Sequence, residues 1–76
     1  MIQDSDLDNW FTYHKPTGDQ PERYERIRAA AYAFAQVVRD ETPASADQTA
    51  AIRKIREASM TANQAIACSG VHELKP

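Results

Sequence analysis

Flat and cationic side chains gather in one short stretch near the N-terminus of this chain. Trp10, Phe11, Tyr13, His14 and Lys15 lie within six positions, just before the first helical pattern. A ring beside cations can stack a nucleobase, and the unpaired N–H groups of a helix N-terminus favour an anion such as phosphate. For Trp10 and Phe11 a structural alternative stays open, in which the rings fold back over one end of a helical core. Tyr13, His14 and Lys15 favour a ligand site.

Two further groups of candidate binding residues fall on the expected helices. Arg26 and Arg28 come early in the first helical pattern, and Arg28 lies off its apolar stripe. In the second pattern Arg56, Met60 and Asn63 are spaced by four and three residues, so they share one helix face. A mid-helix asparagine costs helix propensity, and its amide suits the edge of an adenine. The plain alternative is a solvated face, or the charged rim of an oligomer interface.

The other reactive residue types argue against catalysis and against a metal. The carboxylates are scattered over solvent faces, no glycine-rich loop or nucleophile elbow is present, and Cys68 has no base near it in the sequence. A single cysteine excludes an internal disulfide and a multi-cysteine zinc site, and neither His14 nor His72 has a histidine four residues away. We expect no enzyme activity, no cofactor, no metal, and a Cys68 that is a small buried side chain.

Length and charge narrow the class of protein further. The chain has 76 residues and a formal net charge of −2, whereas generic nucleic-acid binders are usually basic over a whole domain. No apolar run approaches the roughly 20 residues of a membrane span, and the acidic N-terminus is unlike a signal peptide. We expect a cytoplasmic protein with a reduced thiol, whose partners include neither a membrane nor a nucleic acid polymer.

Two helical patterns separated by a proline must position these groups. Thr17 opens a capping-box pattern, Thr-x-x-Gln, and Ser45 opens a second one, Ser-x-x-Gln. Pro43 stops the first helix, and Gly70 is expected as the residue that ends the second. The chain is then one domain with five segments: an N-terminal segment 1–16, a first helix 17–42, a hinge 43–45, a second helix 46–69 and a tail 70–76.

Each expected helix carries one apolar stripe with spacings of three, four, three and four residues. The stripes are Tyr24, Ile27, Ala31, Phe34 and Val38 in the first helix, and Ile52, Ile55, Ser59, Ala62 and Ile66 in the second. Two helices bury one seam each and leave their flanks exposed, and chains this short are marginal alone. The predicted fold is all-α: an antiparallel two-helix hairpin with an aromatic N-terminal segment, assembled into a homo-oligomeric helical bundle.

The residues of both helices also resemble a known family. "WFTYHKPT", "QPERYERIR" and, most specifically, "IRKIREASMTANQAIAC" are similar to the phage helical-hairpin sponge proteins, the anti-CBASS cyclic-nucleotide sponges and the related anti-Thoeris sponges. The resemblance implies a phage protein that acts in the host cytoplasm. It would bind and sequester cyclic nucleotide immune signals, either cyclic dinucleotides or cyclic ADP-ribose isomers, without degrading them. It implies a small homo-oligomer, often a hexamer, with pockets between subunits.

The resemblance assigns roles to particular residues. Tyr13 stands where the family has the aromatic ring that stacks on a base, and Arg28, fifteen positions later, stands where it has the basic residue that contacts phosphate. The anti-CBASS type typically has lysine there, and arginine offers a planar fork instead. Met60 and Asn63 match pocket residues of the second helix. Basic groups late in that helix, on which a trinucleotide pocket relies, are missing from "NQAIACSG".

Two readings from other classes compete with the sponge. The first is a non-enzymatic oligomeric helical adaptor with no small-molecule ligand, whose aromatic residues only close the core. The second, a helix-turn-helix repressor, is disfavoured by the long helices, the linker and the acidic charge.

Overall fold

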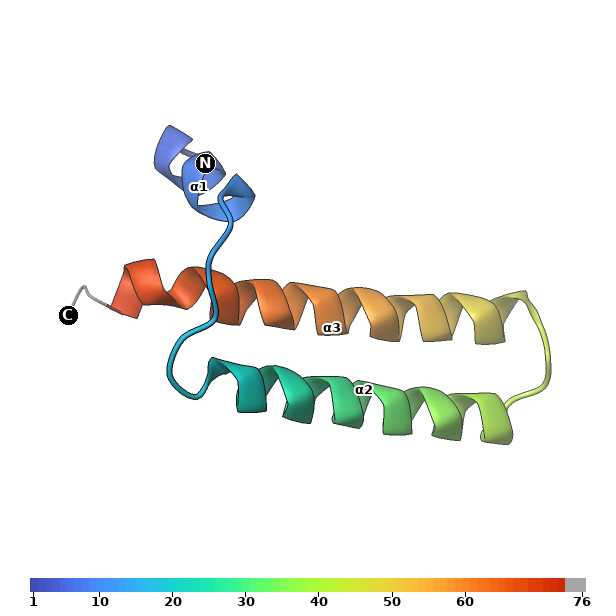
Figure 1. Cartoon of the computed structure of the whole chain (residues 1–76). Helices are drawn as coiled ribbons and strands as arrows, with labels where there is room; N and C mark the ends of the chain where they lie inside the picture. The colour runs from blue at the N-terminus through green and yellow to red at the C-terminus, as the bar shows by residue number, and fades with distance from the viewer. Residues whose placement is uncertain (74–76) are drawn as a thin grey trace.

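Two long antiparallel helices form the body of the molecule in the computed structural model, which describes the backbone of residues 1–73 and the side chains of residues 1–69. The helices are α1 (Asp4–Phe11), α2 (Gln20–Glu41) and α3 (Ala46–Glu73), and no strand occurs in the described backbone. α2 and α3 lie side by side, while the short α1 stands off the C-terminal half of α3, on the side away from α2 (Figure 1). The predicted all-α helical hairpin is confirmed. Among residues 1–73 no helix has the length and apolar character needed to cross a membrane.

A helix at the N-terminus is the main departure from the sequence-based expectation. The prediction that the aromatic cluster lies wholly outside the helices is wrong for Trp10 and Phe11, which form the last turn of α1. Asp4 and Asp6 stand in the first turn, where carboxylates favour the positive end of the helix dipole. The carboxylate of Asp6 also accepts a hydrogen bond of 2.8 Å from the backbone N–H of Gln3. Leu7, Trp10 and Phe11 share one face of α1 by their spacing of three and four residues, but a helix of eight residues carries too few of them for the pattern to stand out in the sequence.

The start of α2 lies three residues beyond the predicted cap. Thr17 to Gln20 form a tight turn, in which the N–H of Gln20 donates to the carbonyl of Thr17 at 3.0 Å. Gly18 takes a left-handed φ of 57°, which a residue without a Cβ adopts at low cost. The side chain of Gln20 still reaches back to the N–H of Thr17 at 3.1 Å, and its amide group donates to the carbonyl of Ile66 at 3.3 Å. Gln20, the first residue of α2, therefore ties the preceding turn to the helix and anchors the helix start to α3.

The turn between α2 and α3 follows the predicted capping closely. The hydroxyl of Ser45 accepts a hydrogen bond of 3.1 Å from the N–H of Gln48, as expected for an N-cap. Gln48 does not complete the box, because its amide donates to the carbonyls of Arg39 at 3.0 Å and Thr42 at 3.1 Å. One side chain thus satisfies carbonyls that the end of α2 leaves without helical partners.

The expected stop at Gly70 is wrong, because α3 continues to Glu73. A glycine ends a helix when the next step requires a left-handed residue, and inside a helix it costs only about 1 kcal/mol relative to alanine. No proline follows Gly70 until Pro76. Residues 74–76 of the expected tail lie outside the described residues.

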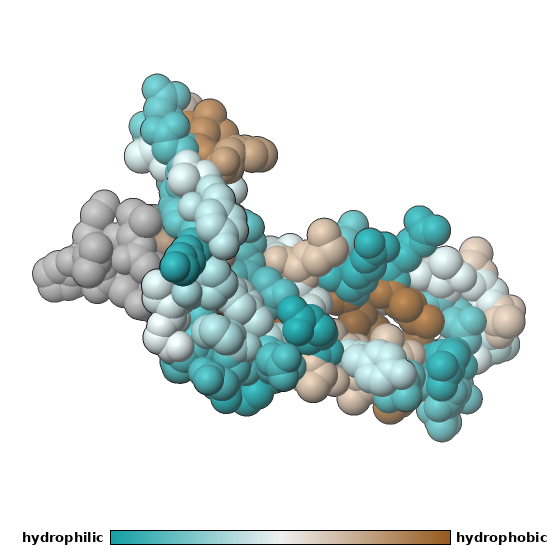
Figure 2. Space-filling model, viewed as in Figure 1, coloured by the Kyte–Doolittle hydropathy of each residue, from teal (hydrophilic) through white to brown (hydrophobic). Residues whose placement is uncertain are grey.

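The core between the helices is thin. The predicted stripes are half-buried for the most part, but only Ile66 and Cys68 are nearly fully buried among the hydrophobic residues of the described part. Phe34, placed on the stripe of the first helix, is 59% exposed. Figure 2 shows apolar side chains open to solvent in a hollow between the long helices. The single chain therefore leaves much of its apolar surface uncovered.

Candidate ligand-binding site

A groove across α2 and α3 brings together four residues that the sequence singled out. Arg28 from α2 and Arg56, Met60 and Asn63 from α3 line it, in a volume of about 470 Å³. The other lining residues are Ala31, Tyr32, Ala35, Ile52, Ile55 and Ser59. We call this the arginine groove. The three-four spacing that placed Arg56, Met60 and Asn63 on one helix face is the reason they meet here.

The arginine groove offers two exposed guanidinium groups, of which one is weakly paired and one is not paired within the described side chains. The guanidinium of Arg28 has one distant ion pair, 4.0 Å from the carboxylate of Glu25, and its side chain is 67% exposed. Arg56 makes no ion pair with any residue of the described side chains. Two exposed arginines from facing helices can bind a phosphate, because each guanidinium group can donate two parallel hydrogen bonds to its oxygens.

Asn63 adds an unsatisfied polar atom to the arginine groove. Its Oδ1 is shielded from solvent and has no hydrogen-bond partner within residues 1–69. Buried side-chain oxygens are nearly always paired, so an added hydrogen-bond donor at this position would be stabilising. An amide oxygen accepts from an N–H group, such as the exocyclic amine of a base. The position therefore suits the recognition of a base edge.

Tyr32 is a groove residue that sequence reasoning missed. It lies one helical turn after Arg28, lines the same groove and is 66% exposed. Together with Arg28 it also borders a shallower hollow on the outer face of α2. The available signal was its place off the apolar stripe, four residues after a candidate phosphate ligand. An exposed ring beside two guanidinium groups is a stacking surface for a base.

The aromatic segment lies apart from the arginine groove, because none of its residues lines that groove. Trp10 and Phe11 are exposed on α1, and Tyr13 and Lys15 are exposed in the connection to α2. The structural alternative supposed that the Phe11 ring folds back over one end of the core. Phe11 is 83% exposed, so in the single chain it does not do so. His14 is half-buried and its Nε2–H donates to the carbonyl of Asn9 at 2.6 Å.

Arg26 lies in a neighbouring hollow rather than in the arginine groove. That hollow has a volume of about 680 Å³ at the start of α2, between Pro16 and Arg28. Tyr24 and the carboxylates of Glu22 and Glu25 also line it. Arg28 lines both spaces, so the hollow beside the segment that precedes α2 is adjacent to the arginine groove.

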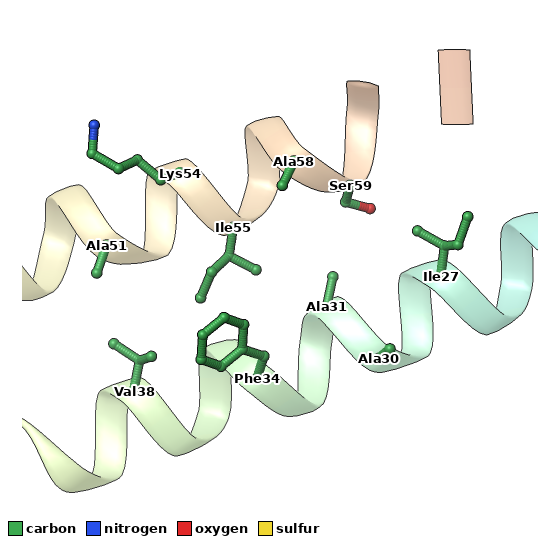
Figure 3. A pocket seen from close by; sticks show the side chains of 10 residues that line it. All are labelled: Ile27, Ala30, Ala31, Phe34, Val38, Ala51, Lys54, Ile55, Ala58 and Ser59. Atoms are coloured by element: carbon green, nitrogen blue, oxygen red, sulfur yellow. The ribbon is translucent and has the colours of Figure 1, made fainter. Parts of the chain in front are cut away.

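A third space between the helices is apolar. Its volume is about 590 Å³, and the residues lining it are Ile27, Ala30, Ala31, Phe34, Val38, Ala51, Lys54, Ile55, Ala58 and Ser59. The side chains of Phe34, Val38 and Ile55 point into it, while Lys54 directs its amino group away (Figure 3). We call this the apolar groove. It has no polar group at its centre that could orient a small ligand.

Reactive groups are scarce around these spaces. No group of three or more histidine, cysteine or carboxylate side chains is placed to hold a metal ion within the described part of the chain. The thiol of Cys68 is free and buried.

Comparison with known proteins places the chain in one family. The family model described as "Acb2/Tad1, hairpin domain" matches residues 3–67, which include α1, all of α2 and most of α3. No curated protein and no solved structure matches the chain. The chain therefore belongs to the Acb2/Tad1 hairpin-domain family, the anti-CBASS and anti-Thoeris sponge family that its helices resemble.

Proposed function

We propose that this chain is a phage anti-defence protein that binds cyclic nucleotide immune signals in the host cytoplasm and withholds them without degrading them. Membership of a family of binding proteins supports this. The observation that carries it is the arginine groove, where the guanidinium groups of Arg28 and Arg56, of which only Arg28 has a weak ion pair, lie beside an exposed ring and an unpaired amide oxygen. Phosphate, base face and base edge each find a matching group there.

The division of labour in the proposed site follows from the chemistry of each group. Arg28 and Arg56 hold the phosphates, Asn63 accepts a hydrogen bond from the base, and Met60 supplies an apolar contact. Tyr32 is placed to stack a base within the same subunit. Tyr13 does not line the groove of its own chain, so we propose that it stacks a base in a pocket shared with a second subunit. Trp10, Phe11, His14, Lys15 and Arg26 border that shared pocket.

Self-association is part of the proposal. The apolar groove leaves Phe34 and its neighbours open to solvent, and a patch of this kind on a small chain favours a partner. A second copy carries the same exposed helices and can cover them. We propose a homo-oligomer, with the hexamer of the family as its expected size.

The residue types that line the arginine groove favour binding of a nucleotide over its hydrolysis. Among the side chains of residues 1–69, no histidine, cysteine or carboxylate lines the arginine groove. Guanidinium groups stay protonated at neutral pH and do not act as bases, and Ser59 has no base beside it in the groove. A phosphodiester bound in the arginine groove would therefore meet cations and an amide, but no nucleophile that the described lining residues of this groove activate.

Equilibrium dialysis against labelled cyclic di-AMP, cyclic di-GMP and cyclic ADP-ribose tests the proposal. We expect wild type to bind at least one of the three. We expect Arg56→Ala to weaken that binding by roughly tenfold, the cost of one charge-assisted contact. Arg53→Ala is the matched control, because Arg53 is on the same helix but outside the arginine groove. Binding to none of the probes would favour the adaptor, and equal losses in both variants would place the site elsewhere.

A further inference from the structure

α1 is attached to the hairpin by the carbonyl groups of its last turn. The carbonyl of Trp10 accepts a hydrogen bond from the amide Nε2 of Gln64 at 3.2 Å. The carbonyl of Asn9 accepts from the thiol of Cys68 at 3.6 Å. The last carbonyls of a helix have no partner within the helix. Here α3 supplies those partners from more than fifty residues along the chain.

The two donors on α3 form one connected group. The amide of Gln64 also donates to the sulfur of Cys68 at 3.1 Å, so the hydrogen bonds run from Gln64 through Cys68 to the carbonyl of Asn9. Asn9 and Cys68 are only 8% and 6% exposed, which shields the end of this chain of bonds from water. Hydrogen bonds in such a network strengthen one another.

Apolar packing on α1 is incomplete. Of its large apolar residues, Phe11 is 83% exposed, while Leu7 and Trp10 remain 44% and 43% exposed. In Figure 1 the helix stands away from the body of the hairpin. The polar contacts of Gln64 and Cys68 therefore add to a modest apolar contact in fixing the position of α1.

Tyr13 takes its position from α1. The residue before it, Thr12, donates its hydroxyl to the carbonyl of Asp8, and the residue after it, His14, donates to the carbonyl of Asn9. Both neighbours of Tyr13 are thus bonded to the last turn of α1, while the Tyr13 side chain itself is 82% exposed. The backbone is held and the ring is left open to a ligand.

We propose that Gln64 and Cys68 are positioning residues for the Tyr13 ring: by capping α1 they hold the ring ready to stack a base. The inference rests on the proposed function. Fixing the ring beforehand lowers the entropy lost when a ligand binds. Gln64 directly follows Asn63, which lines the arginine groove. One turn of α3 therefore serves both the groove and the segment that carries the ring.

The test compares Gln64→Met, which keeps the side-chain length and removes the donor, with Gln36→Met on α2. Within the described side chains, Gln36 makes no side-chain hydrogen bond that the change could break. Binding is measured by titrating each protein with cyclic di-AMP, cyclic di-GMP and cyclic ADP-ribose. Trp10 is the only tryptophan of the chain, so quenching of its fluorescence by iodide reports whether α1 stays docked. Thermal melting followed by circular dichroism reports the hairpin.

We expect Gln64→Met to bind the preferred probe roughly three- to tenfold more weakly, the loss that one hydrogen bond causes. Trp10 should become more accessible to iodide. In a Tyr13→Ala background Gln64→Met should cause no further loss, because the two changes act through the same ring. Cys68→Ala should act in the same direction as Gln64→Met, and Cys68→Ser, which keeps a donor, should restore most of the affinity.

Three results would overturn the positioning role. They are wild-type affinity in Gln64→Met, unchanged quenching of Trp10, and an equal loss of affinity with and without the Tyr13 ring. In each of these cases the wild-type protein still binds a probe, so only the positioning role fails. If the wild-type protein binds none of the three probes, the proposed function fails, and the positioning role fails with it. Binding by the wild-type protein therefore distinguishes the two failures.

Discussion

Replacing Asn63 with leucine should change stability and binding in opposite directions. The Oδ1 atom of Asn63 is shielded from solvent and unpaired within the described side chains. A buried polar group in this state costs about 1–3 kcal/mol. Leucine has nearly the same length and no polar atom, so Asn63→Leu removes that cost. The gain in helix propensity from asparagine to leucine adds a few tenths of a kcal/mol.

The expected size of the effect follows from these terms. One kcal/mol shifts the melting temperature of a domain of this size by about 4–8 °C, so the ligand-free variant should melt at least about 4 °C above wild type. Binding should weaken by roughly tenfold or more, because the base loses its acceptor in the arginine groove. A residue kept at a cost to stability is typical of a binding site.

Thermal melts at one fixed protein concentration, with and without a bound probe, measure both effects. Thr61→Leu is the control, because Thr61 is an exposed residue of α3 with a similar helix propensity to asparagine. It carries the propensity gain without removing a buried amide. A lower melting temperature for ligand-free Asn63→Leu would show that the assembled protein already pairs this oxygen. A higher melting temperature with unchanged affinity would remove Asn63 from the site.

Four further predictions concern the ring, the charges, the assembly and the cap. Tyr13→Ala and Arg28→Ala should each weaken binding by roughly tenfold to a hundredfold in a titration while circular dichroism stays unchanged; wild-type affinity in either variant contradicts the role of that residue. Affinity should change less than about twofold between pH 6 and 8, since arginine stays protonated throughout; a loss centred where histidine titrates would point to His14 instead. Phe34→Asp should dissociate the assembly toward the mass of one chain, 8.5 kDa, in light scattering, and a wild type that is already monomeric at micromolar concentration would refute self-association. Ser45→Ala should lower the free energy of unfolding by about 1 kcal/mol in urea titrations, and an unchanged midpoint would mean that the Ser45 cap contributes nothing.

The hairpin was predictable because its signals are local and agree with one another. Pro43 stops the first helix, Ser45 caps the second, and two apolar stripes of equal period require the helices to pair. The structure confirms the paired helices and the Ser45 cap. Gly70 misled because a glycine inside a helix and a glycine beyond its end look alike in sequence.

α1 was missed although Leu7, Trp10 and Phe11 follow helical spacing, because three apolar residues in a segment of eight give a short signal. Its sequence, DSDLDNWF, is rich in acids, and its place on α3 depends on hydrogen bonds from Gln64 and Cys68 to backbone carbonyls. Contacts that use a backbone atom leave no trace in the residue types of the segment they bind. Such long-range contacts appear only when the fold is known.

The candidate site was partly predictable, because part of it depends on the spacing of residues along one helix. Arg56, Met60 and Asn63 share a helix face by spacing alone, and the groove brings Arg28 to them. Tyr32 was missed because its one signal in the sequence is its place off the apolar stripe, four residues after Arg28. Tyr13 lies outside the arginine groove of its own chain, and a residue that acts in a shared pocket cannot be placed from one subunit.

Recovery of the ligand after capture tests the central claim most directly. The purified protein is incubated with cyclic di-AMP, cyclic di-GMP and cyclic ADP-ribose, the free ligand is separated by ultrafiltration, and the protein is then denatured and the released nucleotide analysed by chromatography. Sequestration predicts that at least one probe disappears from the filtrate and returns unaltered after denaturation. An altered nucleotide would show an enzyme, and a filtrate that retains all three probes would contradict cyclic nucleotide binding.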